Sequence, residues 1–367
     1  MTNCRCATGP LFVIPNTCFT HQKCLSEAFF HSGFAENCFR MHCIEREICS
    51  RMFRWSTIEK GQSHGLAGAP RTCKNGRMDD IITVDFRELS LDDRAFMERC
   101  RDPEQNPFTA LSFPSLFTWR QAYGLRVARN EEAFVIMSLH DQGFYCPCGT
   151  EAGCRALMDS VIGTEKGTRI LYLTEKQAEF WAARGFSVRL REDLSEYLAS
   201  APALALRSGH ESNSYKMKCR HFKKEISYHT ERIDAGNIEK VTALADRLTS
   251  VEAETEKGDG EVLLAEIDAF RKLNLYGLLL ETEDGRTAFI LGYENRPDMF
   301  TMTMSKHDPS LPPETTAVLV HELALGLCDR YPLINLEEDL GLPGLRRAKM
   351  LYSPVGNLEV YEAVQHE

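Results

Sequence analysis

Residues 331–354 read YPLINLEEDLGLPGLRRAKMLYSP, and they combine more kinds of chemically active side chain than any other stretch of the chain. The stretch starts with a period-two alternation of apolar and polar residues, which predicts a β-strand. In such a strand Asn335, Glu337 and Asp339 share one face, and Ile334 lies on the other. The sequence therefore predicts a sheet that presents a row of polar side chains.

A short helix is predicted directly after this strand. Gly341 and Gly344 interrupt the strand pattern, and Pro343 suits the first turn of a helix. Arg346 and Lys349 are three residues apart, so they share one face of that helix. Two cations are therefore expected close to the polar strand face. This arrangement fits either a substrate site or an ordinary network of surface salt bridges.

The same stretch resembles the signature of the phosphatidylglycerol lysyltransferase C-terminal domain family. The signature motifs NRExDLG, LRxAK and SYxP are matched by Asn335, Glu337, Asp339, Leu340, Gly341, Leu345, Arg346, Ala348, Lys349, Tyr352 and Pro354. The resemblance extends over most of residues 78–367. It implies an α/β (α+β) fold of two tandem GNAT-like acyltransferase domains, with mixed, mostly antiparallel sheets flanked by helices. The best-studied members transfer an aminoacyl group from a transfer RNA to a lipid headgroup.

The resemblance also suggests roles for individual side chains. Asn335, Glu337 and Asp339 would orient the acceptor amine or hydroxyl, and Tyr352 would donate a proton to the leaving oxygen. The cations that would bind phosphate or carboxylate are Lys306, Arg346 and Lys349. The chain is thus expected to be an aminoacyltransferase or acyltransferase that acts on an amine or hydroxyl acceptor.

Three positions depart from the family pattern. Ser305 and Leu336 stand where Glu and Arg are usual, and Leu351 stands where Ser usually precedes the tyrosine. A protein whose site has lost charged residues in this way could keep its fold and bind a ligand without catalysing a reaction. A non-catalytic binding module therefore stays open as an alternative.

Composition indicates a two-domain protein that does not bind polyanions indiscriminately. The chain has 367 residues, is 43% hydrophobic and carries a formal net charge of −10. An acidic protein lacks the broad basic field that non-specific nucleic-acid binding needs. The longest apolar run, residues 317–328, is shorter than a bilayer-spanning helix and contains His321 and Glu322. We therefore expect a cytoplasmic protein.

The chain is predicted to divide into three parts. Residues 1–77 hold eight of the 14 cysteines without regular periodicity, which fits an extension upstream of a start at Met78, a disordered segment or a metal-binding module. An Ala-, Ser- and Gly-rich stretch near residues 199–209 places the boundary between two GNAT-like domains, 78–207 and 208–367. Within the second domain, the alternation predicts strands at 276–281, 287–293 and 299–305, followed by a buried helix over 314–330.

A basic amphipathic helix is predicted over residues 213–229. Tyr215, Cys219 and Phe222 fall on one stripe of this helix. The cations on the remaining surface are Lys216, Lys218, Arg220, Lys223 and Lys224. Such a face could contact the phosphates of a transfer RNA, a lipid headgroup, coenzyme A or another small molecule. A purely solvated face is the simpler interpretation.

The sequence of one loop indicates which acyl donor the chain uses. GNAT proteins that use acyl-CoA hold its pyrophosphate with the amide groups of a Gly-rich RxxGxG/A loop that opens a helix. The corresponding residues 307–315 here read HDPSLPPET, and proline has no amide hydrogen to donate. We therefore expect no bound cofactor and no metal, and an aminoacyl-tRNA is favoured over acyl-CoA as the co-substrate.

Overall fold

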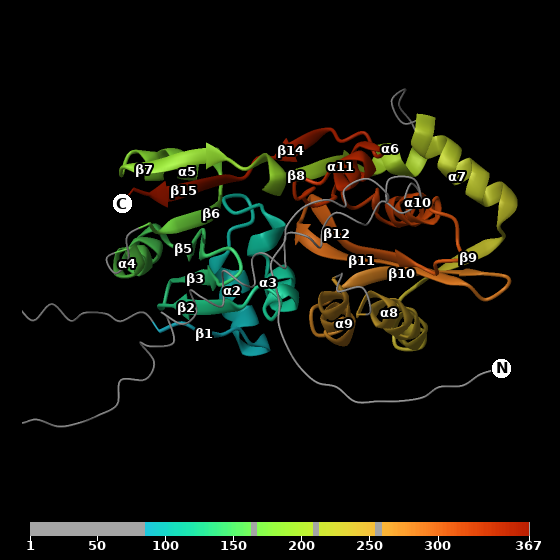
Figure 1. Cartoon of the computed structure of the whole chain (residues 1–367), viewed down its shortest axis with the longest axis horizontal. Helices are drawn as coiled ribbons and strands as arrows, with labels where there is room; N and C mark the ends of the chain where they lie inside the picture. The colour runs from blue at the N-terminus through green and yellow to red at the C-terminus, as the bar shows by residue number, and fades with distance from the viewer. Residues whose placement is uncertain (1–84, 163–166, 208–212, 254–258, 367) are drawn as a thin grey trace, which may run out of the picture. The chain divides into compact units, whose positions relative to one another are not determined.

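The computed structural model describes residues 85–162, 167–207, 213–253 and 259–366. The predictions for residues 1–77 lie outside this part of the chain. Two sheets, flanked by helices, make up the described residues (Figure 1). Both sheets are mostly antiparallel, as the sequence predicts, and each contains one parallel pair: β4 with β6, and β12 with β13.

The first sheet has the strand order β1-β2-β3-β4-β6-β15-β7, with β5 paired to β3. Its strands are Arg87–Glu88 (β1), Leu125–Arg129 (β2), Ala133–Ser138 (β3), Gly143–Tyr145 (β4), Cys148–Gly149 (β5), Arg169–Leu173 (β6), Phe186–Leu190 (β7) and Tyr361–Gln365 (β15). The helices of this half are Leu91–Asp93 (η1), Arg94–Cys100 (α2), Thr109–Leu111 (η2), Phe113–Trp119 (α3), Glu151–Ile162 (α4), Glu175–Ala182 (α5) and Glu192–Leu194 (η3).

The second sheet has the order β14-β8-β13-β12-β11-β10-β9. Its strands are Glu196–Ser200 (β8), Tyr228–Arg232 (β9), Tyr276–Thr282 (β10), Thr287–Arg296 (β11), Met299–His307 (β12), Leu333–Asn335 (β13) and Gly356–Leu358 (β14). Its helices are Ala201–Leu206 (α6), Asn213–Glu225 (α7), Ile238–Ala253 (α8), Gly260–Asp268 (α9), Thr315–Leu327 (α10) and Pro343–Met350 (α11).

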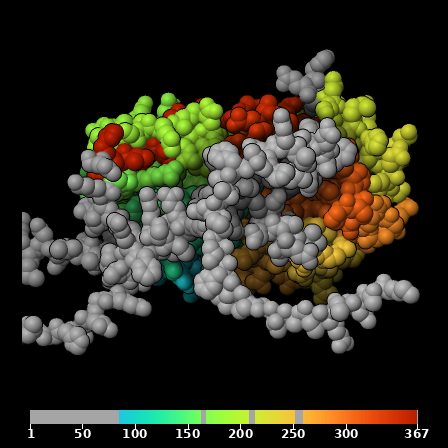
Figure 2. All heavy atoms as spheres, viewed as in Figure 1, coloured from blue at the N-terminus to red at the C-terminus, as the bar shows by residue number. Residues whose placement is uncertain are grey.

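The two sheets exchange one strand each. From β1, the first sheet follows chain order as far as β6 and then continues with β15 and β7. From β9, the second sheet follows chain order as far as β13 and then continues with β8 and β14. In each sheet the sixth strand, β15 or β8, comes from the other half of the chain. The C-terminal strand β15 pairs with β6 and β7 in the first sheet, whereas β8 pairs with β13 and β14 in the second. Figure 2 shows red C-terminal residues among the green residues of the first sheet. Sheet membership therefore does not follow the predicted boundary at residue 207, because β8 lies before it and β15 lies at the far end of the chain.

Alternation along the central strands divides the apolar residues between two cores. On β10, Leu278 and Leu280 pack with α6, α7 and α10, whereas Leu279 faces the opposite side, toward α8 and α9. The core on the α8 and α9 side is continuous with the core of the first sheet. The predicted buried helix is α10, whose residues Val318 and Leu323 are fully buried. No helix of the described residues is long and apolar enough to cross a bilayer.

The strand predicted through residue 339 ends at Asn335 instead. Glu337 and Leu340 adopt left-handed backbone conformations, with φ of 61° and 52°. A left-handed residue breaks the two-residue alternation of a strand. The prediction that Asn335, Glu337 and Asp339 share one strand face is therefore wrong, whereas the helix predicted after Pro343 is confirmed as α11.

Candidate active site

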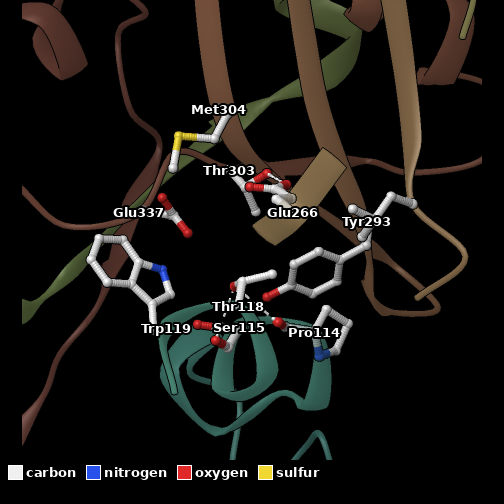
Figure 3. Close-up of a pocket in the computed structure, with 10 residues that line it drawn as sticks. Pro114, Ser115, Thr118, Trp119, Glu266, Tyr293, Thr303, Met304 and Glu337 are labelled. Atoms are coloured by element: carbon white, nitrogen blue, oxygen red, sulfur yellow. Dashed lines mark hydrogen bonds between the residues drawn. The ribbon is translucent and has the colours of Figure 1, made fainter. Parts of the chain in front are cut away.

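A small cavity lies where α3 and α9 meet one face of the second sheet (Figure 3). Its volume is about 20 Å³, enough for one water molecule or for a group of similar size such as a terminal ammonium. We call it the Glu337 cavity. It is lined by Pro114, Ser115, Thr118, Trp119, Glu266, Leu275, Tyr293, Thr303, Met304 and Glu337.

Glu337 points its carboxylate into this cavity (Figure 3). Within the described residues, no hydrogen bond engages that carboxylate, while the backbone N–H of Glu337 donates to Asn335 Oδ1 at 2.8 Å. Burial raises the pKa of Glu337 well above its usual value, and the nearby charge of Glu338 raises it further. Lys349 acts in the opposite direction. A strained backbone and a partly buried acid with a raised pKa are typical of a proton acceptor at a functional site.

Glu266 enters the same cavity from α9. Glu266 is 3% exposed, and its carboxylate accepts a hydrogen bond from the hydroxyl of Thr303. Burial raises the pKa of Glu266 to about 7. The charge of Glu266 also raises the pKa of Glu337, so the two carboxyl groups interact across the cavity.

Two other hydroxyl groups of the cavity donate their protons to neighbouring oxygens. Tyr293 Oη and Ser112 Oγ are 2.6 Å apart, and Ser112 donates its own hydrogen to Thr109 O, so Tyr293 is the donor to Ser112. Thr118 donates to the main-chain carbonyls of Pro114 and Ser115. The cavity thus offers carboxylate, phenol and hydroxyl oxygens as acceptors, and the indole N–H of Trp119 is a donor.

Behind the cavity, Asn335 belongs to a buried network with Glu196 and Thr109. Glu196 Oε1 accepts the Thr109 N–H at 2.7 Å, and Glu196 Oε2 accepts from Thr109 Oγ1 at 3.1 Å and from Asn335 Nδ2. Burial and the charge of Glu338 raise the pKa of Glu196 to about 7. Because Asn335 Oδ1 also holds the backbone of Glu337, Asn335 acts as a positioning residue for Glu337.

Acidic groups continue beyond Glu337 toward the first sheet. Burial raises the pKa of Glu338, and the charge of Asp141 contributes to this rise. Lys349 donates to Leu336 O, and its charge lowers the pKa values of Glu337 and Glu338. Among the described residues, no group of three or more His, Cys, Asp or Glu side chains is arranged to hold a metal ion.

Asp339 and Arg346 form a separate cluster. Asp339 is fully buried and accepts from Arg346 Nε at 2.6 Å, from Tyr197 Oη at 2.7 Å and from the Gly341 N–H at 2.8 Å. Burial alone would raise the pKa of Asp339, but the bonds from Arg346 and Tyr197 outweigh it and lower the pKa. Asp339 therefore favours its ionised form, and Arg346 is engaged by it.

Two further predicted residues lie outside the Glu337 cavity. Tyr352 is buried in the second core with its ring 5.6 Å from that of Tyr215, and burial raises its pKa. Lys306, at the end of β12, pairs with Asp259 at 2.6 Å. Of the predicted residues, Glu337, Asn335 and Lys349 are thus brought together, while Asp339, Arg346, Tyr352 and Lys306 are not part of this group.

The basic helix α7 packs its apolar stripe into the second core, as predicted, through Tyr215, Cys219 and Phe222. Lys223 pairs with Glu322 at 2.9 Å, and Arg220 and Lys224 are exposed. Lys216 is on the same helix and is half-buried. None of the cations of α7 lines the Glu337 cavity, and α7 lies at the opposite end of the second sheet from α3 (Figure 1).

Sequence reasoning missed Trp119, Glu266 and Tyr293. Trp119 ends an aromatic helix whose composition indicates core packing, and Tyr293 lies within β11, a largely apolar strand. Glu266 is the residue of the three that the sequence marks most clearly, because it interrupts the apolar run VLLAEI of α9. A charged residue on the buried face of a helix is unusual enough to indicate a polar site.

Comparison with known proteins agrees with this architecture. A family model described as phosphatidylglycerol lysyltransferase, C-terminal, matches residues 106–364. Comparison with curated protein sequences gave no significant match.

Solved structures share the fold at low sequence identity. A conserved protein of unknown function from Bacteroides thetaiotaomicron has a TM-score of 0.68 and 24% identity, covering 77% of this chain and 99% of that one. The L-PGS of Bacillus licheniformis has a TM-score of 0.53 and 16% identity, with 74% and 92% covered. A C-terminal domain assigned to a lysylphosphatidylglycerol synthetase of Agrobacterium fabrum has a TM-score of 0.55 and 14% identity, with 76% and 93% covered.

Proposed function

The chain belongs to the phosphatidylglycerol lysyltransferase C-terminal family, and we propose that it is an aminoacyl- or acyltransferase whose amine-bearing substrate reacts at Glu337. The family and the tandem GNAT-like fold support acyl transfer as the reaction class. The choice of an amine rests on the lining of the cavity, and the choice of donor rests on the loop between β12 and α10.

One observation carries the choice of an amine: the Glu337 cavity is rich in acceptors and poor in donors. Glu337 and Glu266 supply carboxylates, and the hydroxyls of Tyr293, Thr118 and Thr303 donate to other oxygens. The indole N–H of Trp119 and the hydroxyl of Ser115 are the side-chain donors that remain in the lining. An ammonium group has only hydrogens to donate, so it complements such a lining. A phosphate or a carboxylate would meet repulsion from both glutamates.

Glu337 is positioned to act as the general base. A substrate ammonium would transfer one proton to the ionised Glu337 carboxylate, and the freed amine lone pair would then attack the carbonyl carbon of the acyl ester. The electron pair of the broken ester bond leaves with the departing oxygen, which takes a proton and becomes a hydroxyl. The raised pKa of Glu337 makes its ionised form a stronger base, while a smaller fraction of Glu337 is ionised at a given pH.

The loop between β12 and α10 favours an aminoacyl-tRNA over acyl-CoA as the donor. Pro312 and Pro313 offer no amide hydrogens in this loop, and the N–H of Ser310 is already bonded to Asp308 Oδ1 at 3.0 Å. Asp308 adds a negative charge at the point where a pyrophosphate would have to lie. A loop of this kind is poorly suited to binding the pyrophosphate of coenzyme A.

A non-catalytic binding module is the second candidate function, and Ser305 supports it. Ser305 replaces a family glutamate, and its buried hydroxyl has no hydrogen-bond partner among the described residues. A site that has lost a charged group and not replaced its interactions could bind an amine without transferring an acyl group to it.

A transfer assay separates the two. The full chain is incubated with a pool of transfer RNAs carrying radiolabelled amino acids and with primary-amine and phosphatidylglycerol acceptors, and parallel reactions contain acetyl-CoA or a long-chain acyl-CoA. We expect label to move from transfer RNA to an acceptor, and the Glu337→Gln variant to lose this activity. Transfer from acyl-CoA alone would overturn the choice of donor. Saturable amine binding without any transfer would favour the binding module.

A further inference from the structure

A second, larger hollow follows the free edge of the second sheet. It has a volume of about 720 Å³ and contains none of the residues that line the Glu337 cavity. We call it the β14 groove. It is lined by Pro107, Phe108, Thr174, Glu175, Tyr197, Met350, Pro354, Val355, Gly356, Asn357, Leu358, Glu359 and Tyr361.

One wall of the groove is a continuous piece of chain. Residues 354–359 are six consecutive lining residues, and β14 forms their centre. At about 3.3 Å per residue, an extended chain of this length spans roughly 17 Å. β14 is the last strand of its sheet and is paired only with β8 among the described strands. The groove therefore runs along a sheet edge.

Within the described residues, the hydrogen-bond pattern leaves the main-chain groups of Asn357 without a partner in the sheet. Asn357 lies opposite Tyr197 of β8, but the N–H of Tyr197 donates to Glu337 O at 3.1 Å and its C=O accepts from the Leu336 N–H at 2.8 Å. Both main-chain groups of Tyr197 thus point away from β14. In an antiparallel ladder, the main-chain groups of its partner Asn357 then point away from β8, outward from the sheet.

The side chains around this edge favour a particular occupant. Val355 and Met350 are 62% and 56% exposed, which is a large apolar surface to leave in water. The charged lining residues are Glu175 and Glu359, and both act on the phenol of Tyr361, which donates to Glu359 Oε2 at 3.1 Å. The two carboxylates therefore gather at one part of the groove.

We propose that the β14 groove binds an extended peptide segment that carries a basic side chain and adds to the second sheet as a further strand. The peptide would exchange main-chain hydrogen bonds with Asn357, place apolar side chains on Val355 and Met350, and direct its Lys or Arg toward Glu175 and Glu359. Main-chain bonds supply affinity in such strand addition, and the pockets for side chains supply selectivity. The proposal is independent of the chemistry at Glu337.

The test uses the full chain and fluorescence anisotropy with a labelled, acetylated and amidated peptide, Val-Lys-Val-Lys-Val. Two matched probes are Val-Glu-Val-Glu-Val and a Val-Lys-Val-Lys-Val peptide methylated on its central backbone nitrogen. We expect the lysine peptide to bind and both matched probes to bind at least tenfold more weakly, because one loses charge complementarity and the other loses a main-chain donor. Absence of lysine-peptide binding up to about 1 mM would overturn the proposal.

Two variants at one position isolate the main-chain contact. Asn357→Pro removes an N–H that points away from β8 and fixes the backbone φ, so it deletes no hydrogen bond of the β14–β8 ladder, and we expect a loss of tenfold or more in affinity. Asn357→Ala keeps the main-chain groups and should bind like the unaltered chain. The double variant Glu175→Gln and Glu359→Gln should weaken the lysine peptide and not the acidic one.

The result would contradict the proposal if Asn357→Pro and Asn357→Ala bound equally well, or if the two glutamines had no effect. Should Asn357→Pro fold poorly, amide hydrogen exchange of the unaltered chain gives an independent answer. Saturating lysine peptide should slow exchange at Asn357 at least tenfold, and unchanged exchange would count against strand addition.

Discussion

Glu337 and Glu266 point into one cavity from elements that are far apart in the sequence. Burial raises the pKa of both groups, and the charge of Glu266 adds a smaller rise at Glu337. Glu337 follows β13 in the signature stretch, and Glu266 belongs to α9. Two acids held together in this way resist simultaneous ionisation, so each binds a proton or a cation more readily than it would alone. This relationship makes the cavity suited to an ammonium group.

The first prediction concerns the base. Glu337→Gln should lower kcat for acyl transfer by about 100-fold or more, because the variant cannot take the substrate proton. In the unaltered enzyme only the ionised carboxylate is active, so kcat/KM should rise with pH through a pKa well above 4.5. The variant should lose this limb of the pH profile. If kcat/KM of the variant still rose with pH in the same way, the group that titrates would be a residue other than Glu337.

A matched control for this experiment is Glu179→Gln. Glu179 is an exposed residue of α5 and lines neither the Glu337 cavity nor the β14 groove. Its replacement should leave both the rate and the pH profile unchanged.

The second prediction concerns stability and Glu266. The folded state raises the pKa of Glu266 from 4.5 to about 7, so between these values the folded chain holds a proton that the unfolded chain has lost. Stability contributed by this proton is complete below pH 4.5 and is lost as the pH rises toward 7. Glu266→Gln removes the titration. Relative to the variant, the unaltered chain should therefore lose up to about 3 kcal/mol between pH 5 and pH 8.

Thermal melts of both chains at the two pH values measure this difference. Glu261→Gln is the control, because Glu261 is an exposed residue of the same helix. If the melting temperatures of the unaltered chain and the Glu266→Gln variant changed equally with pH, the pKa of Glu266 in the folded chain would be the same as in the unfolded chain.

The third prediction follows from the exchanged strand. β15 lies between β6 and β7, and its Glu362 carboxylate is 1% exposed and bonded to Arg169, Arg189 and Arg191. A chain that ends at Val360 should lose the cooperative unfolding of the first sheet, because two neighbouring strands lose their partner. Calorimetry measures the loss as a lower transition enthalpy. A chain that ends at Gln365 is the control and should melt within about 5 °C of the full chain.

The Glu362→Gln variant tests the ion-pair part of this effect. Removing the carboxylate leaves three guanidinium groups around a buried neutral amide, at a cost of about 2 kcal/mol or more. Burial would raise the pKa of Glu362, but bonds from the three arginines lower it. The stabilisation is therefore present above pH 4.5 and is lost as the pH falls below that value, so the two chains should converge in acid.

The fourth prediction concerns α7. If a transfer RNA is the donor, reversing the exposed cations with Arg220→Glu and Lys224→Glu should weaken its binding mainly at low ionic strength, about 0.05 M, because salt screens exposed charges. Filter binding over a salt series measures the effect. The matched control is Arg271→Glu with Lys272→Glu, two adjacent exposed cations on another segment. Equal weakening by both pairs would mean that transfer RNA responds only to net charge.

The sequence by itself determined the elements that depend on local pattern. Alternation predicted the three strands that became β10, β11 and β12, and helical spacing predicted the buried stripe of α7. Pro343 marked the start of α11. Each of these signals lies within one element, because side-chain direction repeats every two residues in a strand and every 3.6 in a helix.

Only the tertiary structure decided the pairing of strands and the composition of the cavity. The exchange of β8 and β15 joins segments more than 100 residues from their sheet neighbours, and no local pattern encodes that pairing. The pattern of α3 makes Trp119 indistinguishable from a core residue, and the pattern of α9 shows only a charged residue at Glu266. The two become a site only where those helices meet the second sheet. The left-handed backbone at Glu337 turned its carboxylate into the cavity and left Asp339 bonded to Arg346 and Tyr197. The physical reason is that burial and the charges of neighbouring side chains set the pKa values, and both exist only after the separate elements have packed together.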